Sequence, residues 1–98
     1  MKMNRVFVYG ILVGQYEAED ASLYGYKKVT GIGGYADIVE DNNGRVDGEL
    51  VIVNDGTLKY FDMIESNGSF YKRHKVKVET PRGFVENVWV YQQMRNLI

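Results

Sequence analysis

The sequence predicts an α+β fold, a small antiparallel or mixed six-stranded β-barrel with one main helix packed at the barrel mouth. Three observations predict it: runs rich in β-branched and aromatic residues, turn residues between these runs, and one stretch with a helical period. The chain has 98 residues, enough for one modest core, so residues 1–98 are expected to form a single domain.

Six segments have the composition and the flanking turn residues of strands. The first is a continuous apolar run, typical of a strand covered on both faces. Glycine-rich residues 31–34 predict a turn. DNNG at 41–44 predicts a hairpin turn, because Asn and Gly accept the positive φ that such turns require. The strands are expected at 5–9, 23–30, 35–40, 45–53, 69–80 and 84–93.

The helix is expected at about 57–65. Leu58, Phe61 and Ile64 recur at a helical period, and the preceding NDGT segment supplies N-cap residues. Glu65 shares a face with Leu58 and Phe61. A carboxylate therefore points where a core residue is expected, in the last turn before the helix stop SNG.

Glu65 has two interpretations. As an ordinary helix-end residue it would pair with Lys59 or Arg73. As a carboxylate desolvated by apolar neighbours it would have a pKa raised toward neutrality. A group with such a pKa can both accept and donate a proton near pH 7, as a general acid/base must.

A second candidate feature is the segment VYGIL, where the first strand ends in a sharp turn. Gly10 lets the backbone approach a ligand closely, and the amides of Gly10, Ile11 and Leu12 are expected to form an anion-binding nest.

The composition excludes several kinds of site and partner. The net charge of −1 predicts no general affinity for nucleic acid or anionic lipid. Without cysteine there is no disulfide and no thiolate nucleophile, and with His74 as the lone histidine a metal site is not expected. No segment is long enough to span a membrane, and the apolar N-terminus is interpreted as a buried strand rather than a signal peptide. We therefore expect a cytoplasmic protein without a metal site.

The motifs occur in the order of a known family. VFVYGIL resembles the opening signature of the gamma-glutamylcyclotransferase-like family, which usually reads V-Y-G-[Ser/Thr]-L. GGYADIV resembles its glycine-Tyr-Pro landmark, and RVDGELVIV its V-x-G-E strand. LKYFDMIESNGSFYKRHKVKV resembles its block of Leu-Asp, an apolar residue and Glu, followed by Tyr-x-Arg. VENVWVYQQ resembles its closing strand, so the resemblance covers nearly the whole chain.

The resemblance implies a cofactor-free reaction on gamma-glutamyl amines or gamma-glutamyl amino acids. The α-amine of the substrate attacks its own γ-amide carbonyl, which gives 5-oxoproline and releases the amine. Glu65 matches the family's acid/base glutamate. The segment from Tyr9 through Gly10 and Ile11 to Leu12 matches the loop whose amides hold the substrate carboxylate. Tyr71 matches a tyrosine that borders the cavity.

Two other functions remain open. Ile11 replaces the usual hydroxyl residue, which favours a non-catalytic module that binds a small ligand or a protein on the same fold. The basic strand YKRHKVK places Tyr71, Arg73, Lys75 and Lys77 on one face, a pattern that also occurs in nucleic-acid-binding strands. Because of the charge balance we expect a small-molecule substrate, no nucleic acid and no membrane partner; the sequence predicts no oligomeric state.

Overall fold

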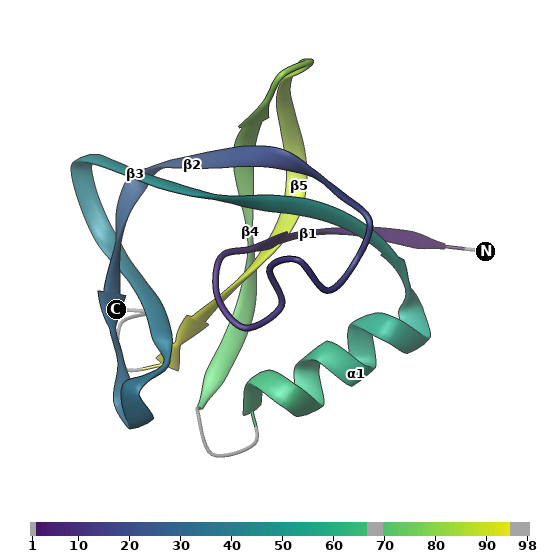
Figure 1. Ribbon diagram of the computed structural model, residues 1–98, viewed down its shortest axis with the longest axis horizontal. Coiled ribbons are helices and arrows are strands. Elements are labelled where there is room, and N and C mark those ends of the chain that lie inside the picture. The colour runs from purple at the N-terminus through teal and green to yellow at the C-terminus, as the bar shows by residue number, and fades with distance from the viewer. Residues whose placement is uncertain (1, 67–69, 95–98) are drawn as a thin grey trace.

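A computed structural model describes residues 2–66 and 70–94. The fold is α+β, with one α-helix and five strands in the described residues (Figure 1). In chain order the elements are β1 (Met3–Val8), β2 (Ala18–Thr30), the short 3-10 helix η1 (Ile32–Gly34), β3 (Ala36–Asn54), α1 (Asp55–Ser66), β4 (Tyr71–Thr80) and β5 (Gly83–Gln93). The described helix is too short to cross a membrane.

The strands pair in the order β1-β3-β2-β4-β5 and form a closed barrel, because β5 also pairs with β1. The β1–β5 pairing is parallel, and the other four pairings are antiparallel. The closure is uneven: β2 and β3 pair along most of their length, whereas β2 and β4 are joined at Ser22 and Glu79.

The expected count of six strands is wrong, because two expected strands are one continuous β3. Residues 41–44 do not make a hairpin. Both flanks of this segment pair with β2, so the register jumps from Tyr24↔Arg45 to Tyr26↔Glu40 and the four residues form a bulge. The glycine-rich turn is confirmed: the N–H of Gly31 donates to the carbonyl of Tyr35 over 2.7 Å, and β2 returns there as β3.

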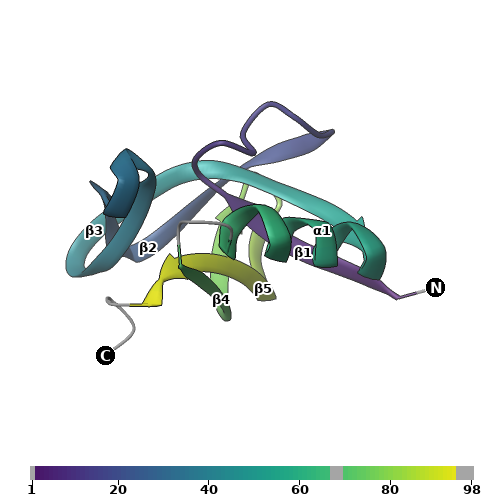
Figure 2. The same ribbon diagram turned by 90° about the horizontal axis from the view of Figure 1, so that it is seen from below.

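Two apolar clusters hold the fold together. Phe7 and Tyr9 belong to a cluster with residues from all five strands, which fills the inside of the barrel. Val6 and Val8 point to the other face, as alternation along a strand requires, and pack with Leu58 and Phe61 of α1. The helix therefore covers the outer face of the sheet instead of closing the barrel mouth as expected (Figure 2).

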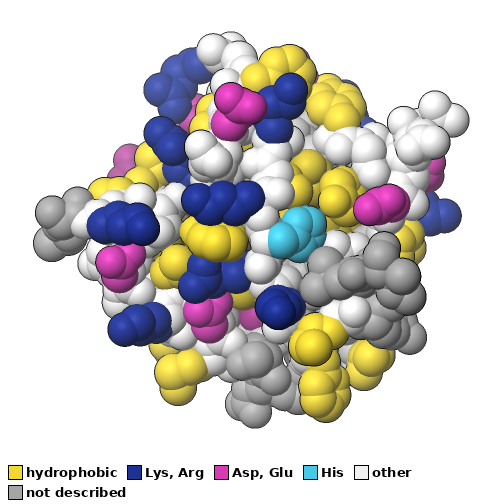
Figure 3. Space-filling model, turned by 180° about the vertical axis from the view of Figure 1, so that it is seen from behind, with side chains coloured by type: hydrophobic (Ala, Val, Ile, Leu, Met, Phe, Trp, Pro, Cys, Tyr) yellow, Lys and Arg dark blue, Asp and Glu magenta, His cyan; other side chains and the backbone are white. Residues whose placement is uncertain are grey.

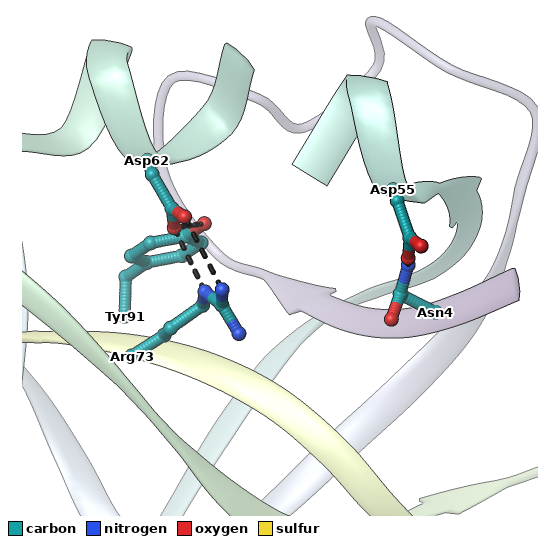
Figure 4. Close-up of polar contacts among 5 residues, drawn as sticks. All are labelled: Asn4, Asp55, Asp62, Arg73 and Tyr91. Carbon is teal, nitrogen blue, oxygen red and sulfur yellow. Dashed lines mark hydrogen bonds and ion pairs between the residues drawn. The ribbon is translucent and has the colours of Figure 1, made fainter. Parts of the chain in front are cut away.

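Polar contacts fix the start of the helix. The Asn54 side chain accepts from the N–H of Thr57 over 2.8 Å, which confirms the N-cap expected in this segment. The Asn4 amide on β1 donates to Asp55 Oδ1 over 2.8 Å and to the carbonyl of Val53 (Figure 4).

The bulge in β3 gives a first test. A Cβ on Gly44 would overlap the backbone carbonyl of Tyr26, so Gly44→Ala must displace the bulge from β2. We expect a loss of about 1–3 kcal/mol of unfolding free energy in urea denaturation. The matched control is Gly56→Ala in α1, where the nearest atom is 3.5 Å away and helix propensity favours alanine. Equal stabilities for the two variants would contradict this account of the bulge.

Candidate functional site

A cavity of about 290 Å³ lies where β1 ends, between the last turn of α1 and the strands β4 and β5. All six residues singled out from the sequence line it, namely Tyr9, Gly10, Ile11, Leu12, Glu65 and Tyr71. The structure thus brings together residues that are far apart in the chain. The sequence did not single out the other lining residues, which are Phe7, Val8, Tyr35, Ala36, Ile64 and Tyr91.

Glu65 is the carboxylate of this cavity. Burial raises its pKa from 4.5 to about 7. Among the described residues it has no ion pair, and Arg73 is held by Asp62 through an Nε–Oδ1 contact of 2.8 Å. The alternative in which Glu65 pairs with Arg73 is therefore wrong. No ion pair among the described residues offsets the loss of hydration, so both the protonated and the ionised form of Glu65 are populated near pH 7.

Three tyrosines surround this carboxylate. The Tyr9 hydroxyl donates to the backbone carbonyl of Tyr91, and the Tyr71 hydroxyl donates to that of Ala36. Burial, with the charge of Glu65 as a smaller cause, raises the pKa of Tyr71 to about 12 and the pKa values of Tyr9 and Tyr91 further. All three stay neutral near pH 7, so they supply fixed dipoles rather than charge.

The loop after β1 offers unused backbone donors. It is a tight turn in which the carbonyl of Gly10 accepts from Val13 over 3.0 Å. In the described part of the chain, the N–H groups of Gly10, Ile11 and Leu12 donate to no protein acceptor. Leu12 is buried and anchors the turn, whereas the Ile11 side chain is 64% exposed at the rim. All three residues line the cavity, which makes their amides candidate donors for an anionic ligand.

The opposite wall is positioned by Gln93, a buried residue that the sequence analysis missed. Its side chain accepts from the N–H of Ile32 over 2.8 Å and donates to the carbonyl of the same residue over 3.2 Å. Its backbone N–H donates to Asp37 Oδ1 over 2.9 Å. These contacts tie the β2–β3 turn to the end of β5, and so place Tyr35 and Ala36 at the cavity.

The basic face of β4 is largely engaged in contacts within the protein. Arg73 and Lys75 lie 4.2 and 4.7 Å from the centroid of the Trp89 ring. Ring nitrogen Nε2 of His74 lies 2.9 Å from Gln92 Oε1. On the face of the molecule that carries the histidine, basic side chains are interspersed with acidic and hydrophobic ones (Figure 3). Within the described residues, no cluster of three potential metal ligands occurs.

The molecule is a small α+β protein with a cavity that has the carboxylate of Glu65 in its wall. Residues 6–97 match the family described as gamma-glutamyl cyclotransferase, AIG2-like, and the chain belongs to this family. The family resemblance noted in the sequence is thereby confirmed.

Solved structures show the same fold. A protein of Arabidopsis thaliana solved in solution is 28% identical with a TM-score of 0.85, and the match covers 100% of this chain and 66% of that one. A structure described as gamma-glutamyl cyclotransferase is 23% identical with a TM-score of 0.77, over 95% of this chain and 68% of that one. An AIG2-like protein from Mus musculus is 21% identical with a TM-score of 0.80, over 96% and 79%. This chain thus spans just under two thirds of the Arabidopsis protein. The comparison with curated proteins gave no match.

The raised pKa of Glu65 predicts a pH dependence of stability. Between pH 4.5 and about 7, the Glu65 carboxyl group is more fully protonated in the native protein than in the unfolded chain. The unfolding free energy contributed by this group therefore falls as pH rises through that window, by up to about 1.4 kcal/mol per pH unit. Glu65→Gln removes the buried charge, so at pH 8 this variant should be as stable as the wild type or more stable.

Denaturant titrations of both proteins from pH 4 to 8 measure this difference. Glu86→Gln, at an exposed position on β5, serves as the control and should follow the wild-type curve. A Glu65→Gln protein that is less stable than the wild type at pH 8 would show that the carboxylate is favourably paired.

Proposed function

We propose that this protein is a cofactor-free cyclotransferase that converts gamma-glutamyl amines or gamma-glutamyl amino acids to 5-oxoproline and the free amine. The observation that carries the proposal is the desolvated carboxylate of Glu65 in a small cavity, with its pKa raised to about 7. Family membership supports the class of reaction.

The two charged groups on the α-carbon of a γ-glutamyl substrate each have a complementary partner among the residues that line the cavity. The α-carboxylate of the substrate is an anion and fits the backbone donors of Gly10, Ile11 and Leu12. The α-ammonium is a cation and fits beside the Glu65 carboxylate, within reach of the Tyr71 hydroxyl oxygen, which can accept a hydrogen bond. In this pose the chain folds back, and the amine approaches its own γ-carbonyl.

One carboxyl group then performs the proton transfers. Glu65 accepts a proton from the α-ammonium, and the freed amine attacks the γ-carbon to form the new C–N bond of the ring. The tetrahedral intermediate collapses by breaking the bond between the γ-carbon and the leaving nitrogen. Glu65 returns its proton to that nitrogen and then relays the second proton of the new ring nitrogen to the released amine, which leaves as an ammonium, so the enzyme ends in its starting state. A pKa near 7 suits these steps, because no transfer is strongly uphill.

The reaction needs only one substrate, so the main tasks of the protein are orientation and exclusion of water. Apolar side chains of Phe7, Leu12 and Ile64 contribute to the lining and keep the carboxylate poorly hydrated. An intramolecular attack gains rate from a fixed near-attack geometry. A cavity of about 290 Å³ is consistent with one folded γ-glutamyl group whose leaving amine extends toward the rim.

A binding module is the second candidate. Its supporting observation is Ile11, an exposed apolar residue at the rim where the family usually has a hydroxyl. Such a module would bind γ-glutamyl compounds without releasing 5-oxoproline.

The deciding experiment is an assay for 5-oxoproline with purified protein and a panel of γ-glutamyl amines and γ-glutamyl amino acids. We expect turnover by the wild type and a loss of at least about 10²-fold in kcat for Glu65→Gln, because an amide cannot take up the ammonium proton. Glu86→Gln is the control and should retain full activity. Full activity of a folded Glu65→Gln protein would contradict a catalytic role for Glu65. If the wild type binds γ-glutamyl compounds but does not turn them over, the binding module is favoured.

The donor loop is tested separately. A Cβ on Gly10 would lie 3.3 Å from that of Ala36, and the larger side chain of Gly10→Val would project into the cavity wall. We expect KM to rise about tenfold or more, because loss of charged-group hydrogen bonds costs about 1.5–3 kcal/mol. Ile11→Ser leaves the backbone donors in place and should be tolerated. Unchanged affinity in a folded Gly10→Val protein would remove the loop from the site.

A further inference from the structure

A second carboxylate, Asp62, lies one helical turn before Glu65 on the same side of α1. It is held by side chains from two strands. Arg73 on β4 contacts it through Nε–Oδ1 at 2.8 Å and Nη2–Oδ2 at 3.3 Å, and the Tyr91 hydroxyl on β5 donates to Oδ1 over 2.6 Å (Figure 4). The last turns of the helix are thus tied to both strands beside the cavity.

The helix and β4 face each other in two levels. Tyr71 and Arg73 are two residues apart on β4, so their side chains share a face. Asp62 meets Arg73 at one level, and one turn later Glu65 reaches the cavity that Tyr71 lines. Arg73 is therefore a cation on the helix-facing side of β4, one helical turn away from Glu65.

Among residues 2–66 and 70–94, few cations lie around Glu65. The groups that face it or couple to its surroundings are Tyr9 from the loop after β1, Tyr35 and Asp37 from the β2–β3 turn and β3, Tyr71 and Arg73 from β4, Tyr91 from β5, and Asp62 from its own helix. Arg73 is the positive charge in this set. An opposite charge within about 4–6 Å lowers the pKa of a carboxyl group by about 1–3 units.

Arg73 is kept from acting in this way by two contacts. Its guanidinium is paired with Asp62 and also lies 4.2 Å from the centroid of the Trp89 ring on β5. The Arg73 side chain is 27% exposed and that of Asp62 is 39% exposed, so the pair is partly shielded from solvent.

We propose that Asp62 is a positioning residue for Glu65: it fixes the last turn of α1 on β4 and β5, and it holds the Arg73 guanidinium away from the cavity. The catalytic meaning of this contact rests on the proposed function. The effect on Glu65 itself does not, because it is a property of the protein without substrate.

The test is the titration of the Glu65 side-chain carboxyl, followed by ¹³C NMR in substrate-free protein and assigned by the resonance missing from Glu65→Gln. Asp62→Asn keeps the shape of the side chain but frees Arg73 and removes a neighbouring negative charge. We expect the Glu65 midpoint to fall by about 1 pH unit or more. If the protein is active, the acid limb of its kcat/KM profile should shift by the same amount.

The chain offers a matched control. Asp47 accepts from Arg45 Nε over 2.8 Å and from the Ser22 hydroxyl over 2.8 Å on the same oxygen, as Asp62 does from Arg73 and Tyr91, but it lies away from the cavity. Asp47→Asn should leave the Glu65 midpoint unchanged. A folded Asp62→Asn protein in which Glu65 titrates with the wild-type midpoint would overturn the proposal, and Asp62 would then only stabilise the fold.

A second variant decides the matter if Asp62→Asn does not fold. Arg73→Gln removes the cation and leaves the charge of Asp62 unneutralised one turn from Glu65, so the Glu65 midpoint should rise. An unchanged or lower midpoint would overturn the proposal. Neither titration requires turnover, so the role of Asp62 can be tested even if the protein has no cyclotransferase activity. Failure of the proposed function would instead be seen in the 5-oxoproline assay.

Discussion

The desolvation of one carboxylate is the constraint on which the site depends. Glu65 stands at the end of an amphipathic helix whose apolar face packs on β1 and β3, and the same packing that buries Phe61 carries Glu65 out of water. The arrangement costs stability, because the charged carboxylate loses hydration and forms no ion pair with any residue that the structure describes. A cost of this kind persists at functional sites, where a group with a shifted pKa is useful.

The strands around the helix maintain this environment. The hydroxyls of Tyr9 and Tyr71 donate hydrogen bonds to backbone carbonyls and stay protonated, so neither places a negative charge beside Glu65. Arg73 is engaged by Asp62 and Trp89. The loop at Gly10 adds backbone donors, which attract an anion without a charged side chain. In the proposed function, these features let the site bind a zwitterionic α-amino acid group while Glu65 remains able to exchange a proton near pH 7.

Local patterns in the sequence were sufficient to predict much of this arrangement. The period of Leu58 and Phe61 predicted the helix and placed Glu65 on its inner side, and the VYGIL turn indicated the donor loop. The sequence failed where pairing between distant segments decided the structure. DNNG is a strong hairpin signal, but β2 pairs with both of its flanks, and the segment became a bulge. The roles of Tyr91, Gln93 and the Asp62–Arg73 pair depend on the register between β4, β5 and α1, which no local period encodes.

The most direct test of this account is the pKa of Glu65 in the unmodified protein, compared with the acid limb of kcat/KM for a γ-glutamyl substrate. The account predicts that the carboxyl group titrates near pH 7 in the free protein and that the acid limb of the profile has the same midpoint. A Glu65 that titrates near its ordinary value of 4.5, or a profile whose acid limb is unrelated to it, would contradict the claim that a desolvated carboxylate carries the reaction.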